Sequence, residues 1–258
     1  MMRSHRGHAI RAGFAALIMG ACLAPALHAQ STTFSGAVAL SSQLVDRGQA
    51  MTRTTPVVQG AASWTFPAGW SLGLSGSAEG QSPGHVVAAL AQASRHWSLA
   101  GDWQMQANLL YYRYSGTARS RAFDRAEAGL SWTYRDVLTL GLSTIYVIGS
   151  KGQHRPRGAA DISFRWPLAR QLFLSAGAGA TQSPIAPYNT YGYSHEYDHA
   201  GPRRRAREGI HAYGHVGLLW RHGPWRIELD RILADPKTRW QWDVMDASPW
   251  VATISRSF

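Results

Sequence analysis

The segment with the most recognisable chemistry is His195-Glu196-Tyr197-Asp198-His199. It matches the H-E-x-x-H string of zinc peptidases, in which two histidines four residues apart bind zinc from one face of a helix. Here Gly192 precedes the string and Gly201-Pro202 follows it, and no helical pattern of apolar residues surrounds it. We therefore expect a loop at this position, without a metal site and without peptidase activity.

Polar and charged residues also occur at alternate positions within apolar segments. In one interpretation they line an aqueous path whose charges select solutes. In the other they neutralise one another and fill an interior, because a buried charge is costly unless it is paired. The pairs that this second interpretation predicts are Arg125 with Glu127, Asp161 with Arg165, and the row Arg226, Glu228 and Asp230. The full set of lining candidates is Arg47, Gln59, Arg125, Glu127, Asp161, Arg165, Arg226, Glu228 and Asp230.

A basic cluster lies in the longest segment without alternation, Gln182 to Glu208. Its members are Arg203, Arg204, Arg205 and Arg207. On an outer loop they could attract anionic solutes or the phosphates of lipopolysaccharide. A solvated loop without a ligand is the alternative.

The elements that must position these residues are strands, because apolar residues recur with period two almost throughout the chain. Between them lie five short turns, which alternate with longer connections. Short turns at one end and long loops at the other are typical of bacterial outer-membrane barrels. The alternation predicts twelve strands over residues 33–45, 55–66, 70–78, 85–97, 102–113, 123–134, 137–148, 158–166, 172–181, 210–220, 225–233 and 250–258.

Tryptophans bracket the five short turns. Four of them recur at intervals of 33, 35 and 34 residues, and the next follows after 54. Where the facing of a strand is clear, its Trp falls on the apolar side. Aromatic residues gather in this way where a transmembrane barrel crosses a membrane interface. We therefore expect a periplasmic aromatic girdle of Trp64, Trp70, Trp97, Trp103, Trp132, Trp166, Trp220 and Trp225.

The first 29 residues have the features of a secretory signal peptide. Arg3, Arg6 and Arg11 form a basic start, and an apolar region follows from Ala12 to Leu27. Leu27-His28-Ala29 is a plausible cleavage site. Cleavage would leave one domain, residues 30–258, without the single cysteine, Cys22, and therefore without a disulfide. Removal of those arginines lowers the net charge from +11 to +8. An exported cationic chain is expected to meet anionic lipid or solutes rather than nucleic acid.

The last strand ends in Phe258, with Trp250, Ala252 and Ile254 in the same phase. This pattern resembles the C-terminal signal by which the barrel assembly machinery of the outer membrane recognises its substrates. Arg256 departs from it, since an apolar residue or Tyr is usual there. An arginine near the interface can extend its charge to water, so we expect Phe258 to act as the assembly signal.

Several segments resemble the TorF-like porin family (the Gcw_chp group). One is Val38 to Gly48, followed by Pro56 and Gln59-Gly60; the family has a first strand ending in Arg-Gly, then Pro and Gln-Gly. Further matches are Tyr111 to Gly116, in which Ser115 replaces the family's Pro, Ala126 to Ser131, and the closing Ser255 to Phe258. The resemblance implies an outer-membrane barrel that forms a pore, and it supplies no substrate.

We therefore expect an all-β transmembrane antiparallel barrel in the outer membrane of a Gram-negative bacterium, embedded among lipid and lipopolysaccharide. It would pass small polar solutes by diffusion, with a preference for anions that rests on the net charge, and would need no cofactor. One alternative is a non-conducting barrel, filled by side chains, whose outer loops bind a surface ligand. A lipid hydrolase comes third: His211 or His215 could supply the base, but no nucleophile motif accompanies them and we assign no catalytic residue.

Overall fold

The structure, a computed structural model, describes residues 32–80, 86–115, 124–148, 155–182, 210–236, 242–243 and 246–258. The expected signal peptide and the basic cluster Arg203 to Arg207 lie outside these residues. Across the described ranges, no helix has both the length and the apolar character needed to cross a membrane.

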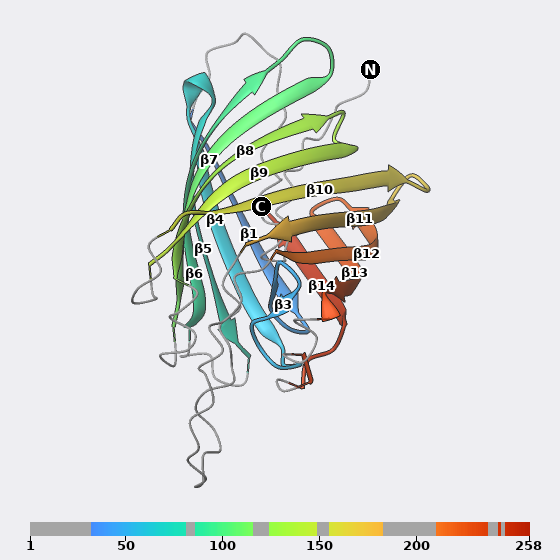
Figure 1. Cartoon of the computed structure of the whole chain (residues 1–258). Helices are drawn as coiled ribbons and strands as arrows, with labels where there is room; N and C mark the ends of the chain where they lie inside the picture. The colour runs from blue at the N-terminus through green and yellow to red at the C-terminus, as the bar shows by residue number, and fades with distance from the viewer. Residues whose placement is uncertain are drawn as a thin grey trace, which may run out of the picture.

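Twelve of the strands in the described residues form a closed antiparallel barrel (Figure 1). Each strand pairs with the next one along the chain, and β1 pairs with β14 to close the ring. Their direction changes steadily around the barrel, from steep in β5 and β6 to nearly level in β10 and β11, as expected of twisted and tilted strands. The twelve are β1 (Thr33–Ser41), β4 (Val57–Thr65), β5 (Trp70–Glu79), β6 (Val86–Ser98), β7 (Trp103–Tyr114), β8 (Arg125–Tyr134), β9 (Leu138–Val147), β10 (Arg157–Pro167), β11 (Leu172–Thr181), β12 (His211–His222), β13 (Trp225–Ala234) and β14 (Trp250–Ser257).

The two faces of the wall follow the sequence alternation. In β13, Ile227 and Leu229 are exposed on the outside, whereas Arg226 and Glu228 are buried on the inside. Successive side chains of a strand point to opposite faces, so one register serves both surfaces. Large apolar side chains exposed over the outer surface are stable only where lipid covers them. The barrel is thus a transmembrane fold of the bacterial outer membrane, as the sequence predicted.

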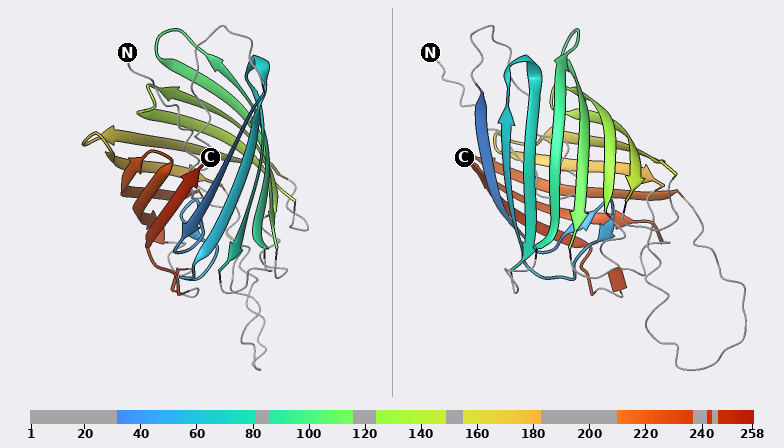
Figure 2. Two further views of the ribbon diagram at one scale, coloured as in Figure 1. Left: turned by 180° about the vertical axis from the view of Figure 1, so that it is seen from behind. Right: turned by 90° about the vertical axis from the view of Figure 1, so that its left-hand side faces the viewer.

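The two ends of the barrel differ in their connections. The short turns follow β4, β6, β8, β10 and β12, and the first contains a 3₁₀ turn, η1 (Pro67–Gly69). The start of β1 and the end of β14 lie at this same periplasmic end (Figure 2). All eight bracketing tryptophans lie in the strand segments next to these turns. Trp70, Trp166, Trp220 and Trp225 are exposed, and the other four are partly exposed.

Two predicted strands differ in detail from those observed. The first ends at Ser41 rather than Val45, because residues 43–50 turn into the barrel interior. The fourth alternates poorly because its outward face is made of alanines while Leu90 faces inward, and a bulge opposite Ser77/Ala78 shifts the phase at its start.

The chain end completes the β1–β14 seam. The backbone of Phe258 exchanges two hydrogen bonds of 2.9 Å with that of Gly36. The ring of Phe258 lies over Gly36, where a side chain would collide with it. Arg256, the residue that departs from the terminal pattern, places its guanidinium 5.5 Å from the ring centre of Trp225. This cation–π contact on the outer surface accounts for a cation at an apolar position.

Candidate functional site

The site is the barrel interior, and its central element is a small hairpin built from the β1–β4 connection. Strands β2 (Val45–Asp46) and β3 (Gln49–Ala50) pair in register around a two-residue turn. Both turn residues, Arg47 and Gly48, have positive φ, at 47° and 73°. That combination is typical of the tight type I′ turns that join antiparallel strands. All six residues from Val45 to Ala50 are buried.

Apolar side chains hold the hairpin on two sides. Leu44, just before β2, packs in a cluster with inward residues of β4, β6 and β7, including Val57, Leu110 and Tyr112. On the other side, Val45 and Ala50 pack with Trp242 and Val251. Trp242 belongs to the β13–β14 connection, and its indole N–H donates to the carbonyl of Gly48 at 3.1 Å. Two extracellular connections therefore meet inside the barrel.

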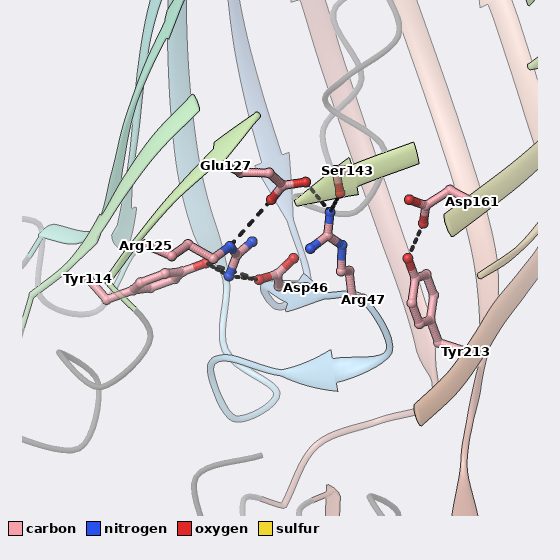
Figure 3. Close-up of polar contacts among 8 residues, drawn as sticks. All are labelled: Asp46, Arg47, Tyr114, Arg125, Glu127, Ser143, Asp161 and Tyr213. Atoms are coloured by element: carbon pink, nitrogen blue, oxygen red, sulfur yellow. Dashed lines mark hydrogen bonds and ion pairs between the residues drawn. The ribbon is translucent and has the colours of Figure 1, made fainter. Parts of the chain in front are cut away.

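Ion pairs fix the hairpin tip to the wall (Figure 3). Asp46 accepts a hydrogen bond from Arg125 of β8 at 2.7 Å and another from the hydroxyl of Tyr114 at 3.1 Å. Arg47 pairs with Glu127, which also belongs to β8. Nε of Arg125 also lies 3.6 Å from Glu127, so the two pairs form one network.

The network is almost fully enclosed, since the side chains of Arg125 and Glu127 are 4% and 0% exposed. Burial alone would raise the pKa of the Asp46 carboxyl, but Arg125 and Arg47 outweigh it and hold that pKa below its ordinary value of 3.8. Asp46 is therefore ionised at neutral pH, and its charge is compensated by hydrogen-bonded arginines.

Glycines on the inner wall make room for large polar side chains beside the hairpin. Tyr213 of β12 donates a hydrogen bond to Asp161 of β10, and Gly179 lies beneath both side chains. A Cβ on Gly48 would lie 2.5 Å from the Cβ of Tyr213. Only glycine fits at a position that combines positive φ with so close a neighbour.

The predicted lining residues all lie on the inner side of the barrel. Arg47, Gln59, Arg125, Glu127, Arg226 and Glu228 are buried, and Asp161, Arg165 and Asp230 are partly exposed. Two of the expected pairs form: Arg125 with Glu127, and Arg226 with Glu228 at 2.7 Å. The expected Asp161–Arg165 pair is wrong, since Asp161 accepts from Tyr213 instead. Arg165 lies four residues along the strand, two inward positions nearer the periplasmic end.

The charge of this set is balanced. Among the eight charged lining residues, four are arginines and four are carboxylates. The net positive charge of the chain is therefore not concentrated on these wall positions.

The histidines considered for lipid hydrolysis also lie on the inner face. His211 is buried, and His215 lies against inward-facing Gly177. Neither imidazole is on the lipid-facing surface that such an enzyme would need. The H-E-x-x-H string lies outside the described residues, and within them no group of three or more His, Cys, Asp or Glu is arranged to hold a metal ion.

Comparison with solved structures agrees with this architecture. The chain is similar to the NanC porin, with a TM-score of 0.50 and 11% identity over 88% of this chain and 99% of that one. The chain has a porin-like fold. The KdgM porin aligns over 87% of this chain and 99% of its own, with a TM-score of 0.48 and 9% identity. OprD from Pseudomonas aeruginosa aligns over 81% of this chain and 61% of its own, with a TM-score of 0.35 and 13% identity. At these identities the similarity extends to the fold and not to a substrate.

No protein-family model matches the sequence, and no curated protein matches it either. The resemblance to the TorF-like group therefore stays a prediction, whereas the porin-like barrel is observed.

The sequence pattern put Arg47 among the lining candidates but did not indicate that a hairpin carries it into the interior of the porin-like barrel. It also missed Asp46, Tyr114 and Trp242, which anchor the hairpin. A signal was present in Asp46-Arg47-Gly48-Gln49, where a glycine follows two polar residues between apolar ones. The glycine favours a turn, but Arg-Gly is not one of the dipeptides typical of a two-residue hairpin. The pattern does not predict that the hairpin turns inward, because that depends on partners far away in the sequence.

Proposed function

We propose that the protein is an outer-membrane porin through which small polar solutes diffuse, and that the β2–β3 hairpin forms its constriction. The observation that carries the proposal is a closed twelve-stranded barrel whose interior combines many buried polar and charged residues with the apolar clusters that hold the hairpin. Twelve strands can enclose more than a packed row of side chains. The hairpin occupies part of this space and narrows it.

We further propose a preference for anions that arises at the mouths of the barrel and not at the constriction. Its support is the net charge of the chain, +11 in total and +8 without the expected signal peptide. Because the lining residues are balanced, cations in the turns and loops would create the preference. We expect it to be weak and to decrease with salt, since charges near water are screened.

A second function has a specific observation in its favour. Every residue from Val45 to Ala50 is buried, and both sides of the hairpin are packed. A barrel sealed by the hairpin would not conduct, and its outer loops would then serve to bind a surface ligand.

Single-channel recording in planar bilayers separates the two functions. The test compares the wild type with a variant in which residues 44–52 are replaced by a short Gly-Ser linker. A variant with a shortened β9–β10 connection is the control. For a porin with a constriction, the wild type conducts in small steps, the hairpin variant in larger ones, and the control like the wild type. Conductance by the hairpin variant alone would indicate the sealed barrel, and absence of steps in both folded proteins would overturn the porin proposal.

A further inference from the structure

A groove lies on the lipid-facing side of strands β5 to β9, where it is lined by alanines of β8 and of β6. The outward residues of β6 are Ala89, Ala91 and Ala93, and the pairing sets Ala91 and Ala93 beside leucines of β5 and larger residues of β7. The groove encloses about 710 Å³ and is almost entirely apolar. Its walls and far end include Leu72, Leu74, Leu109, Tyr111, Tyr146 and Trp64.

Small residues of β6 and β8 between larger residues of β5, β7 and β9 create this shape. On the other side of the barrel, outward positions of β10, β12 and β13 carry bulky residues such as Phe164, Leu218 and Ile227, whereas β11 has the small outward residues Ala176, Ala178 and Ala180.

A cation stands at the periplasmic end of the groove. Arg95 is the next outward residue of β6 after Ala93, about 7 Å along the strand. Its guanidinium lies 5.5 Å from the ring centre of Trp70 and 5.1 Å from that of Trp97. Among the described residues, its buried Nε has no hydrogen-bond partner. The two indoles hold the arginine in place on the membrane-facing surface.

We propose that this groove and Arg95 together bind one anionic glycerophospholipid of the periplasmic leaflet. A guanidinium pairs with phosphate through two parallel hydrogen bonds. The arginine lies beside the short turns, at the level where headgroups of the inner leaflet meet the barrel. An acyl chain that starts at this level extends toward the membrane centre along the alanines. Lipid A, which occupies the outer leaflet, would present its phosphates at the opposite end of the groove.

The chemistry of the site favours a headgroup with net negative charge. No carboxylate pairs with Arg95 among the described residues, so the arginine has an uncompensated positive charge beside the membrane. A headgroup such as phosphatidylglycerol neutralises this charge, whereas a zwitterionic headgroup brings a second cation close to it.

Native mass spectrometry of the full-length folded protein tests the proposal. The protein is released from micelles that contain phosphatidylglycerol, phosphatidylcholine or lipid A. Arg95→Gln removes the headgroup contact, and Ala91→Phe fills the groove. Arg231→Gln is the matched control, because Arg231 also lies on the outer face against a tryptophan, Trp250, but at the extracellular end. Heat-modifiable migration on gels verifies that each variant is folded, and Ala93→Leu replaces Ala91→Phe if the latter does not fold.

We expect the wild type and Arg231→Gln to retain one phosphatidylglycerol. In both groove variants the fraction of protein that retains phosphatidylglycerol should fall by about an order of magnitude, while the single-channel conductance stays unchanged. The proposal would be overturned if Arg95→Gln still retained phosphatidylglycerol, or if Arg231→Gln lost it to the same extent as Arg95→Gln. It would also be overturned if the wild type retained phosphatidylcholine equally well or preferred lipid A. Retention by the filled groove would show a headgroup held without its chain, which also contradicts it.

Discussion

At the scale of single residues, Arg125 holds the barrel interior together. Its guanidinium contacts Asp46 at 2.7 Å, lies 3.6 Å from Glu127, and stacks 4.1 Å from the ring centre of Tyr112. Because all four side chains are buried, removing the arginine leaves two carboxylates with less compensation in an enclosed space. Loss of one partner from a buried pair is much more costly than loss of an exposed one.

We therefore predict that Arg125→Ala lowers the free energy of unfolding by about 3–5 kcal/mol. Urea unfolding in lipid vesicles, followed by tryptophan fluorescence, measures the change. Arg135→Ala is the control, since the Arg135–Asp102 pair is exposed and its loss should not be measurable. Equal unfolding curves for Arg125→Ala and the wild type would show that the network does not stabilise the barrel.

The depressed pKa of Asp46 gives a second prediction at this scale. In the folded protein the pKa of the Asp46 carboxyl is lower than its ordinary value of 3.8. The ionised carboxylate therefore contributes its full stabilisation at any pH above 3.8. This stabilisation is lost as the pH falls through the lowered pKa of the folded state. Conductance should therefore stay constant between about pH 8 and pH 5 and increase only below about pH 4, when the hairpin loses its ionic contact. In Asp46→Asn the larger conductance should already be present at neutral pH. A rise in the wild type between pH 7 and pH 5 would assign the transition to another group.

At the scale of elements, the hairpin depends on one glycine. Gly48 has a φ of 73°, and a side chain there would collide with Tyr213. We predict that Gly48→Val displaces the hairpin from the wall and increases single-channel conductance, while the barrel itself still folds. Gly223→Ala in the β12–β13 turn is the control, because its φ is also positive, at 55°, but no atom lies within 4 Å of the added Cβ. Unchanged conductance in Gly48→Val would show that the hairpin does not limit the path.

The same scale shows how far the sequence predicts the structure. Strands such as β8 and β13 could be recognised because one face meets lipid and the other the interior, so alternation is enforced along their whole length. β6 could not be oriented, because the alanines on its outward face contribute little contrast and Leu90 faces inward. The hairpin was missed because Asp46 and Arg47 find their partners about 80 residues further on, in β8. Local periodicity carries no information on such contacts.

At the scale of the whole molecule, net charge was a poor guide to the interior. The charged lining residues are balanced although the chain carries +11, because arginines also occupy turns and the outer rim, where Arg95 and Arg256 contact tryptophans. Closure of the barrel was easier to predict, since an even number of amphipathic strands with both edges unpaired must close to be stable in lipid. The sequence could not show how few residues would pair where β1 and β14 close the barrel.

The β1–β14 ladder has the fewest registered pairs of the barrel, five from Ala37–Ser257 to Ser41–Thr253. The two backbone hydrogen bonds between Gly36 and Phe258 extend it, and the Phe258 ring covers the glycine. Phe258→Ala should therefore lower the fraction of folded, heat-modifiable barrel in the outer membrane severalfold, and Gly36→Val should do the same by displacing the ring. Leu168→Ala, which truncates an apolar residue exposed in a periplasmic turn, is the control and should leave that fraction unchanged. If Phe258→Ala lowers the fraction but Gly36→Val does not, the residue acts in recognition by the assembly machinery and not in closing the seam.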